Sequence, residues 1–120
     1  MTAPRPLTCS WSRTGPDRSC LELDGELDYD GSDVVLDEII RHLDENPRLR
    51  ELTLDCRRLD FCDSYGLSTL LMIRRRTQST GVVLRLANRG PALDRLLRVT
   101  NTLAHLTDTS VTSLEKQLDT

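Results

Sequence analysis

Short apolar segments alternate with amphipathic segments along most of this 120-residue chain. The apolar segments have the length of β-strands, and the segments between them repeat leucine and isoleucine at three- and four-residue spacing, which is typical of helices. Predicted strands cover about residues 7–12, 18–23, 49–55 and 82–87, and predicted helices run from 32 or 33 to 45, from 64 to 78 and from 91 to about 99. Since parallel strands need a crossover connection, usually a helix, this order predicts an α/β fold. We expect a mixed, mostly parallel sheet of four to five strands with three to four helices packed on it.

Turn residues separate the predicted elements. Gly15-Pro16-Asp17 predicts a turn that joins the first two strands into a hairpin, and residues 25–28 end this hairpin and turn the chain toward the first helix. The first helix is expected to stop at Asn46-Pro47, because the residue before a proline is biased away from helical backbone.

The two ends of the chain carry weaker signals. Residues 1–6 contain two prolines and are expected to form a flexible tail. Residues 103–107 are interpreted as a short edge strand and residues 111–118 as a last helix. A chain of this length is large enough for one hydrophobic core, so residues 7–120 are expected to form a single domain.

Composition indicates a globular protein with a core of leucine, valine and isoleucine. Charged residues make up 29%, the net charge is −3, and aromatic residues are only 3%. No apolar stretch approaches the ~20 residues that cross a bilayer, and the N-terminus lacks the apolar region of a signal peptide. We therefore expect a cytoplasmic protein.

The four cysteines show no metal-ligand spacing. There is no C-x-x-C pair and no Cys/His cluster among Cys9, Cys20, Cys56 and Cys62. They are interpreted as reduced, mostly buried cysteines, and neither a metal nor a cofactor is expected.

A loop after the third predicted strand carries the strongest candidate site. Asp63 is a favourable N-cap, because its carboxylate can accept a hydrogen bond from an amide of the first helical turn. Ser64 then lies at about the first helical position, where free amides and the helix dipole tolerate an anion. Two interpretations follow: the pair is only a helix start, or Ser64 is a position at which one phosphate changes a surface.

Intrinsic catalysis has little support in the sequence. A serine nucleophile needs a base, but His42 lies on a charged helix and His105 in the weak C-terminal region. No G-x-S-x-G elbow surrounds Ser64, and no glycine-rich phosphate loop is present. We expect no enzymatic activity.

Direct nucleic-acid binding is the other alternative, because arginines cluster toward the C-terminal half. Arg74, Arg75 and Arg76 are consecutive, with Arg85, Arg89, Arg95 and Arg98 further along. Three consecutive helical residues point in different directions, and aromatic residues for base stacking are scarce. Solvated helix faces and internal ion pairs explain these arginines better, so no nucleic-acid partner is expected.

The order of elements and three stretches of residues resemble the STAS domain family, and within it the anti-sigma factor antagonists of bacterial partner-switching systems. Residues 23–28 look like the family's early GELD turn, residues 61–67 like its F-x-D-S-x-G-L phosphorylation loop, and residues 81–97 like its G-x-x-L-x-L-x-N strand and following helix. The resemblance covers nearly the whole chain and implies a single STAS-like domain.

The resemblance also implies residue roles. Ser64 corresponds to the phosphoacceptor, Asp63 to the acidic residue before it, and Asp28 to a residue near the same surface; Tyr65 and Gly66 complete the implied partner-binding set. Tyr65 replaces the small residue that is common in the family, which puts a bulky ring beside the site.

The implied partner is an anti-sigma factor with serine-kinase activity. The unphosphorylated protein would bind it and free a sigma factor, phosphorylation at Ser64 would abolish binding, and a serine phosphatase would reverse that step. The alternative is a constitutive STAS interaction module that scaffolds a signalling complex without control by phosphorylation.

Overall fold

The computed structural model describes residues 6–99 of the chain. Four strands and three helices follow one another in the order β1 (Thr8–Gly15), β2 (Arg18–Leu27), α1 (Tyr29–Glu45), β3 (Glu51–Cys62), α2 (Ser64–Ser79), β4 (Val83–Ala87) and α3 (Pro91–Val99).

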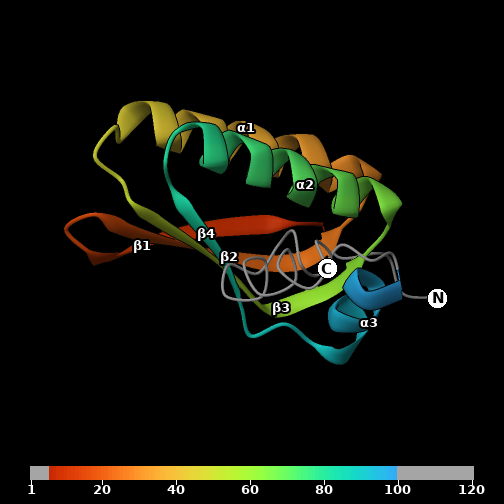
Figure 1. The fold of residues 1–120 in the computed structure, drawn as a ribbon. Helices are drawn as coiled ribbons and strands as arrows, with labels where there is room; N and C mark the ends of the chain where they lie inside the picture. Colours follow the sequence, from red (N-terminus) through yellow and green to blue (C-terminus); the bar gives the residue numbers. More distant parts are fainter. Residues whose placement is uncertain (1–5, 100–120) are drawn as a thin grey trace, which may run out of the picture.

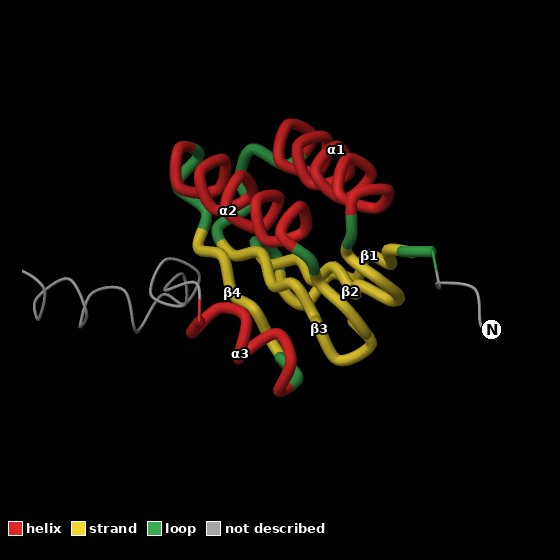
Figure 2. Tube along the Cα trace, turned by 90° about the vertical axis from the view of Figure 1, so that its right-hand side faces the viewer, coloured by secondary structure: helices red, strands yellow, loops and turns green. Residues whose placement is uncertain are grey.

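The strands form one mixed sheet in the order β1-β2-β3-β4. β1 pairs antiparallel with β2, and the other two pairings are parallel. Helices α1 and α2 lie side by side on one face of the sheet, and α3 lies on the other face (Figures 1 and 2). This arrangement confirms the predicted α/β fold with a mostly parallel sheet, while the strand and helix predicted at 103–107 and 111–118 lie outside the described residues. No helix within residues 6–99 is long and apolar enough to cross a membrane.

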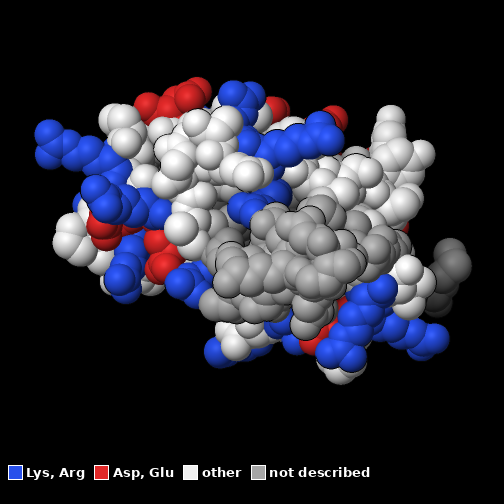
Figure 3. Space-filling view, viewed as in Figure 1, with Lys and Arg blue, Asp and Glu red and all other residues white. Residues whose placement is uncertain are grey.

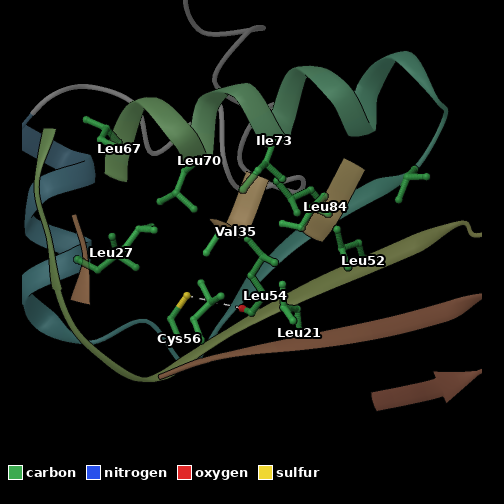
Figure 4. Packing of buried hydrophobic residues seen from close by; sticks show 14 of the residues in the cluster. Leu21, Leu27, Val35, Leu52, Leu54, Cys56, Leu67, Leu70, Ile73 and Leu84 are labelled. Atoms are coloured by element: carbon green, nitrogen blue, oxygen red, sulfur yellow. Dashed lines mark hydrogen bonds between the residues drawn. The ribbon is translucent and has the colours of Figure 1, made fainter. Parts of the chain in front are cut away.

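Alternate side chains of β2 and β3 point toward α1 and α2 and form the core (Figure 4). The fully buried side chains that meet there include Leu21, Leu23 and Leu27 from β2, Leu52 and Leu54 from β3, Val35 and Ile39 from α1, and Leu70 and Ile73 from α2. Each contributes about 1.5–3 kcal/mol of burial free energy. The two helices are therefore held firmly against the sheet, and this packing also fixes the positions of their N-terminal ends.

All four cysteines are free, as predicted. The prediction that most of them are buried is wrong, because Cys56 is buried and the other three are half-buried. Burial raises the pKa of the Cys56 and Cys62 thiols to about 12. Both are therefore neutral, unreactive thiols at ordinary pH.

Two predicted boundaries are wrong around the first crossover. Helix α1 begins at Tyr29 rather than at residue 32 or 33, because Asp28 caps it. Strand β2 continues through residues 25–27, where a turn was predicted. Gly25 has a φ of 119°, and the pairing of β2 with β3 shifts register on either side of it, so the glycine forms an irregularity inside the strand.

The third boundary concerns β3, which runs to Cys62 although the prediction ended it near Asp55. Its additional residues pair with the extended end of β2, and Leu27 lies opposite Cys62. This pairing joins residues that are far apart in the sequence, and residues 57–62 carry no strong strand pattern of their own. Sequence reasoning therefore ended the strand too early.

The single tryptophan connects β1 to α1. The Trp11 ring stacks on His42 with centroids 3.8 Å apart, and its Nε1 donates to Glu38 Oε1 at 3.2 Å. His42 Nε2 lies 2.9 Å from Ser19 Oγ. Burial is the main cause that lowers the pKa of His42, and the nearby Arg13 lowers it further.

Stability is expected to fall in mildly acidic solution because of His42. Its pKa in the folded protein lies below the ordinary value of about 6.5, so the unfolded chain binds the proton more readily. This contribution to stability is complete above about pH 6.5 and is lost as the pH falls from there through the folded pKa. Urea unfolding followed by Trp11 fluorescence should give a smaller free energy of unfolding at about pH 5 than at about pH 7.5. His42→Gln should remove most of that difference, and an equal difference in the variant would contradict this assignment.

Candidate functional site

Two strand ends and two helix starts meet at one edge of the sheet. Strands β2 and β3 are parallel and each leads within two residues into a helix, so α1 and α2 begin side by side, at the right of Figure 1. A hydrogen bond joins the two connections, because the Asp63 N–H donates to the Leu27 carbonyl oxygen at 3.2 Å. Open α/β sheets commonly place their functional loops at this carboxyl edge.

Asp63 and Ser64 form the start of α2 as predicted. Asp63 is the N-cap, with extended backbone (φ −98°, ψ −171°), and its Oδ1 accepts from the Gly66 N–H at 2.9 Å. Ser64 is the first residue of the helix and is exposed. A hydroxyl in this position is open to a modifying enzyme, and the helix dipole favours an anion there.

Asp28 lies at the same edge, where it caps the other helix. Its Oδ1 accepts from the N–H groups of Asp30 and Gly31, each at 3.1 Å. Its carbonyl oxygen accepts from the Ser32 hydroxyl at 2.6 Å. The structure thus brings Asp28 and Asp63 together as matching caps, a role for Asp28 that the sequence pattern had not indicated.

Gly66 is buried beneath the start of α2. A Cβ on this residue would lie 2.3 Å from the Leu27 carbonyl oxygen, 2.9 Å from the Cys62 sulfur and 2.9 Å from Leu27 Cγ. Only glycine lets the first turn of α2 approach the end of β2 so closely. Gly66 therefore positions Asp63 and Ser64 from below, whereas Ser64 and Tyr65 lie at the surface.

Tyr29 belongs to this edge and was missed by sequence reasoning. It is the first residue of α1, and its ring meets the Tyr65 ring edge-on with centroids 5.0 Å apart and planes at 80°. The sequence did contain a signal for this pair. The chain has only two tyrosines, and each directly follows a predicted site residue: Tyr29 follows Asp28, and Tyr65 follows Ser64.

The remaining chemistry of the described residues lies elsewhere. His42 is near the other end of α1, bonded to Ser19, and His105 lies outside the described residues. Residues 6–99 contain no group of three side chains suited to a metal ion. What the edge offers is an exposed hydroxyl in the first turn of α2, beside the capped start of α1.

Removing the Asp63 cap should weaken the start of α2. Asp63→Ala leaves the Gly66 N–H without its acceptor, and a lost N-cap typically costs about 1 kcal/mol. Asp63→Asn keeps an oxygen acceptor and should retain most of the stability. Urea unfolding of the three proteins tests this, and equal losses in both variants would contradict the capping role.

Comparisons with known proteins agree on one fold. A family model described as STAS domain matches residues 12–115. No curated protein sequence matches the chain.

Three solved structures are similar at low sequence identity. The anti-sigma factor antagonist SpoIIAA in its unphosphorylated form is 18% identical, with a TM-score of 0.69 over 79% of this chain and 82% of that one. The phosphorylated form of SpoIIAA, a Bacillus cell fate determinant, is 18% identical, with a TM-score of 0.64 over 79% and 85%. An anti-sigma factor antagonist from Mycobacterium paratuberculosis is 23% identical, with a TM-score of 0.68 over 96% and 99%. These three similarities show the fold. Because the family model covers most of the length of this chain, the chain belongs to the STAS domain family.

Proposed function

We propose that this STAS protein is an anti-sigma factor antagonist controlled by phosphorylation of Ser64. The observation that carries the proposal is the exposed Ser64 hydroxyl at the first position of α2, beside the Asp63 cap and at the edge shared with Asp28. Similar folds have been solved for SpoIIAA both with and without its phosphate, which supports a fold that tolerates both states.

The proposed cycle has two states. Unmodified protein binds an anti-sigma factor that has serine-kinase activity, and a sigma factor is released. The kinase then transfers the γ-phosphoryl group of ATP to Ser64 Oγ, with loss of the hydroxyl proton and formation of ADP, and binding ends. A serine phosphatase hydrolyses the phosphoester and restores the first state.

The physical reason is the different cost of the phosphate in the two states. In the free protein the group lies in water at a helix N-terminus, where a negative charge is favourable by about 0.3–1 kcal/mol. In a complex it brings about −1.5 to −2 charges and added bulk into a contact from which water is excluded. An interface shaped for a hydroxyl has neither the space nor the counter-charge for it.

The other assignments follow from the same proposal. Asp28, Asp63 and Tyr65 belong to the partner-binding surface, and Gly66 supports it from below. Residues 7–120 form the STAS domain after a tail of residues 1–6. The protein acts in the cytoplasm as a binding protein, without catalysis, a cofactor, a metal or direct contact with nucleic acid.

Mass spectrometry of the native protein tests the proposal. Intact mass and peptide mapping would be compared between growing and stressed cells, before and after phosphatase treatment. A phosphatase-sensitive gain of about 80 Da on Ser64 that changes with condition is expected. Ser64 that stays unmodified throughout would instead support the constitutive interaction module.

A further inference from the structure

Both tyrosines of this protein lie at the proposed contact edge. Of the four aromatic residues in the chain, Trp11 is half-buried on β1, whereas Tyr29, Phe61 and Tyr65 are 68%, 49% and 56% exposed. Tyr29 and Tyr65 belong to the first turns of α1 and α2, whereas Phe61 lines a hollow with residues of α3 on the other face of the sheet. Within residues 6–99 the buried core cluster contains only leucine, isoleucine, valine and cysteine, so these rings do not serve core packing.

Tyr29 and Tyr65 are fixed relative to each other. Their edge-to-face contact, with centroids 5.0 Å apart, joins the first turns of two different helices. Such a contact is favourable beyond the burial of the rings and limits the motion of both side chains. A pair of exposed but ordered tyrosines loses little conformational freedom on binding, which is why tyrosine is enriched among interface hot spots.

Charge around the ring pair points to the kind of partner. Segments 26–34 and 60–66 carry no lysine, arginine or histidine, and their acidic residues are Glu26, Asp28, Asp30, Asp33, Asp60 and Asp63. In the view of Figure 3 the right-hand end, over the start of α2, is mostly white, so neither arginines nor acidic residues gather on that part of the surface seen in the view. Two copies of this surface would bring like charges together, which argues against self-association.

We propose that the Tyr29–Tyr65 pair is the anchor of this surface, and that it fits a protein partner with an apolar pocket flanked by arginine or lysine. The inference rests on the proposed function, because it names the chemistry by which the anti-sigma factor would be recognised. Ser64 directly precedes Tyr65, so its phosphate enters the contact next to the anchor, where water exclusion is greatest. Tyr29 is thereby assigned a recognition role together with Tyr65.

Binding of matched variants to purified candidates tests the inference. The probes are the anti-sigma factor kinases encoded in the source genome, each purified separately and titrated calorimetrically with the unmodified full chain. Tyr29→Ser and Tyr65→Ser should each weaken the complex by about 30-fold or more, the size typical of a central aromatic hot spot. Met72→Ser is the matched control, because Met72 is 43% exposed on the same α2 helix, two turns beyond Ser64, and should change affinity by less than about threefold.

Further measurements separate the possible causes. Tyr29→Phe keeps the ring and should bind like the unmodified sequence, and far-ultraviolet circular dichroism should show that all variants fold. Affinity should fall as salt is raised from about 0.05 M to about 0.5 M, because charges on the partner face the acidic surface.

The outcomes distinguish the two proposals. If a kinase binds Tyr29→Ser and Tyr65→Ser as tightly as the unmodified sequence, the anchor role of the tyrosine pair is overturned and the proposed function is not affected. A protein that binds none of the kinases overturns both. A homodimer that dissociates on Tyr29→Ser would replace the heteromeric partner by a second copy and also overturn the inference.

Discussion

Gly66→Ala is expected to destabilise the protein by about 3 kcal/mol, a large effect for one methyl group. The added Cβ would lie 2.3 Å from the Leu27 carbonyl oxygen, which belongs to the backbone and cannot turn aside. To relieve the overlap, α2 must move away from β2. That movement breaks the hydrogen bond from Asp63 N–H to the same carbonyl and loosens the packing of Leu67.

Intrinsic preference works in the opposite direction at this position. Alanine favours a helix over glycine by about 1 kcal/mol, so a stable variant would show that the close contact is unimportant. Urea unfolding monitored by circular dichroism gives the free energy of unfolding directly. Since Ser64 would shift with the helix start, weaker binding to the proposed anti-sigma factor partner is expected as well.

Gly90→Ala is the matched control. Apart from its two chain neighbours, no residue in the described part of the chain has an atom within 4 Å of the position of its Cβ, so no overlap with these residues is created. The change should leave stability unaltered or raise it by about 0.4–1 kcal/mol, because alanine reduces the freedom of the unfolded chain. If both glycine variants lost the same stability, the contact with Leu27 would not be the cause.

Ser64→Asp is expected to reduce affinity for the proposed anti-sigma factor kinase by about 100-fold, equivalent to about 2.7 kcal/mol. The carboxylate imitates part of the charge and bulk of the phosphate at an exposed position beside Asp63. A charge left unpaired in a contact that excludes water commonly costs this much. Ser64→Ala removes the hydroxyl without adding charge and should keep affinity within about threefold.

Stability and binding should move in opposite directions in this variant. An aspartate in the first turn of α2 interacts favourably with the helix dipole, so Ser64→Asp should be as stable as the unmodified protein or up to about 1 kcal/mol more stable. Weaker binding without lower stability identifies a loss at the contact surface. Calorimetric titration and urea unfolding of the same preparations measure both quantities.

A distant charge provides the control for this second prediction. Ser79 is the last residue of α2, about 22 Å along the helix axis from Ser64. Ser79→Asp adds the same charge to the same helix and should leave affinity unchanged. If it weakened binding as strongly as Ser64→Asp, net charge rather than position would control the complex, and if neither did, the protein would be a constitutive module.

Local features of the sequence predicted much of the site correctly. The Asp63 cap depends on a hydrogen bond to an amide three residues away, and the amphipathic stripes of the helices depend on spacings of three and four residues. Both are properties of a short piece of chain. The start of α1 was misplaced because Asp28 and Gly31 are also typical turn residues, and nothing local decides between a turn and a capped helix.

The sequence by itself determined the α/β class, the order of its elements, the Asp63 cap and the place of Ser64 at the start of a helix. Tertiary structure decided that β2 and β3 end together, that Asp28 becomes a second cap at the same edge, and that Gly66 lies against Leu27. It also brought Tyr29 to Tyr65. These contacts join segments separated by a whole crossover, and they depend on the register of a parallel strand pair, which core packing selects and no local pattern encodes.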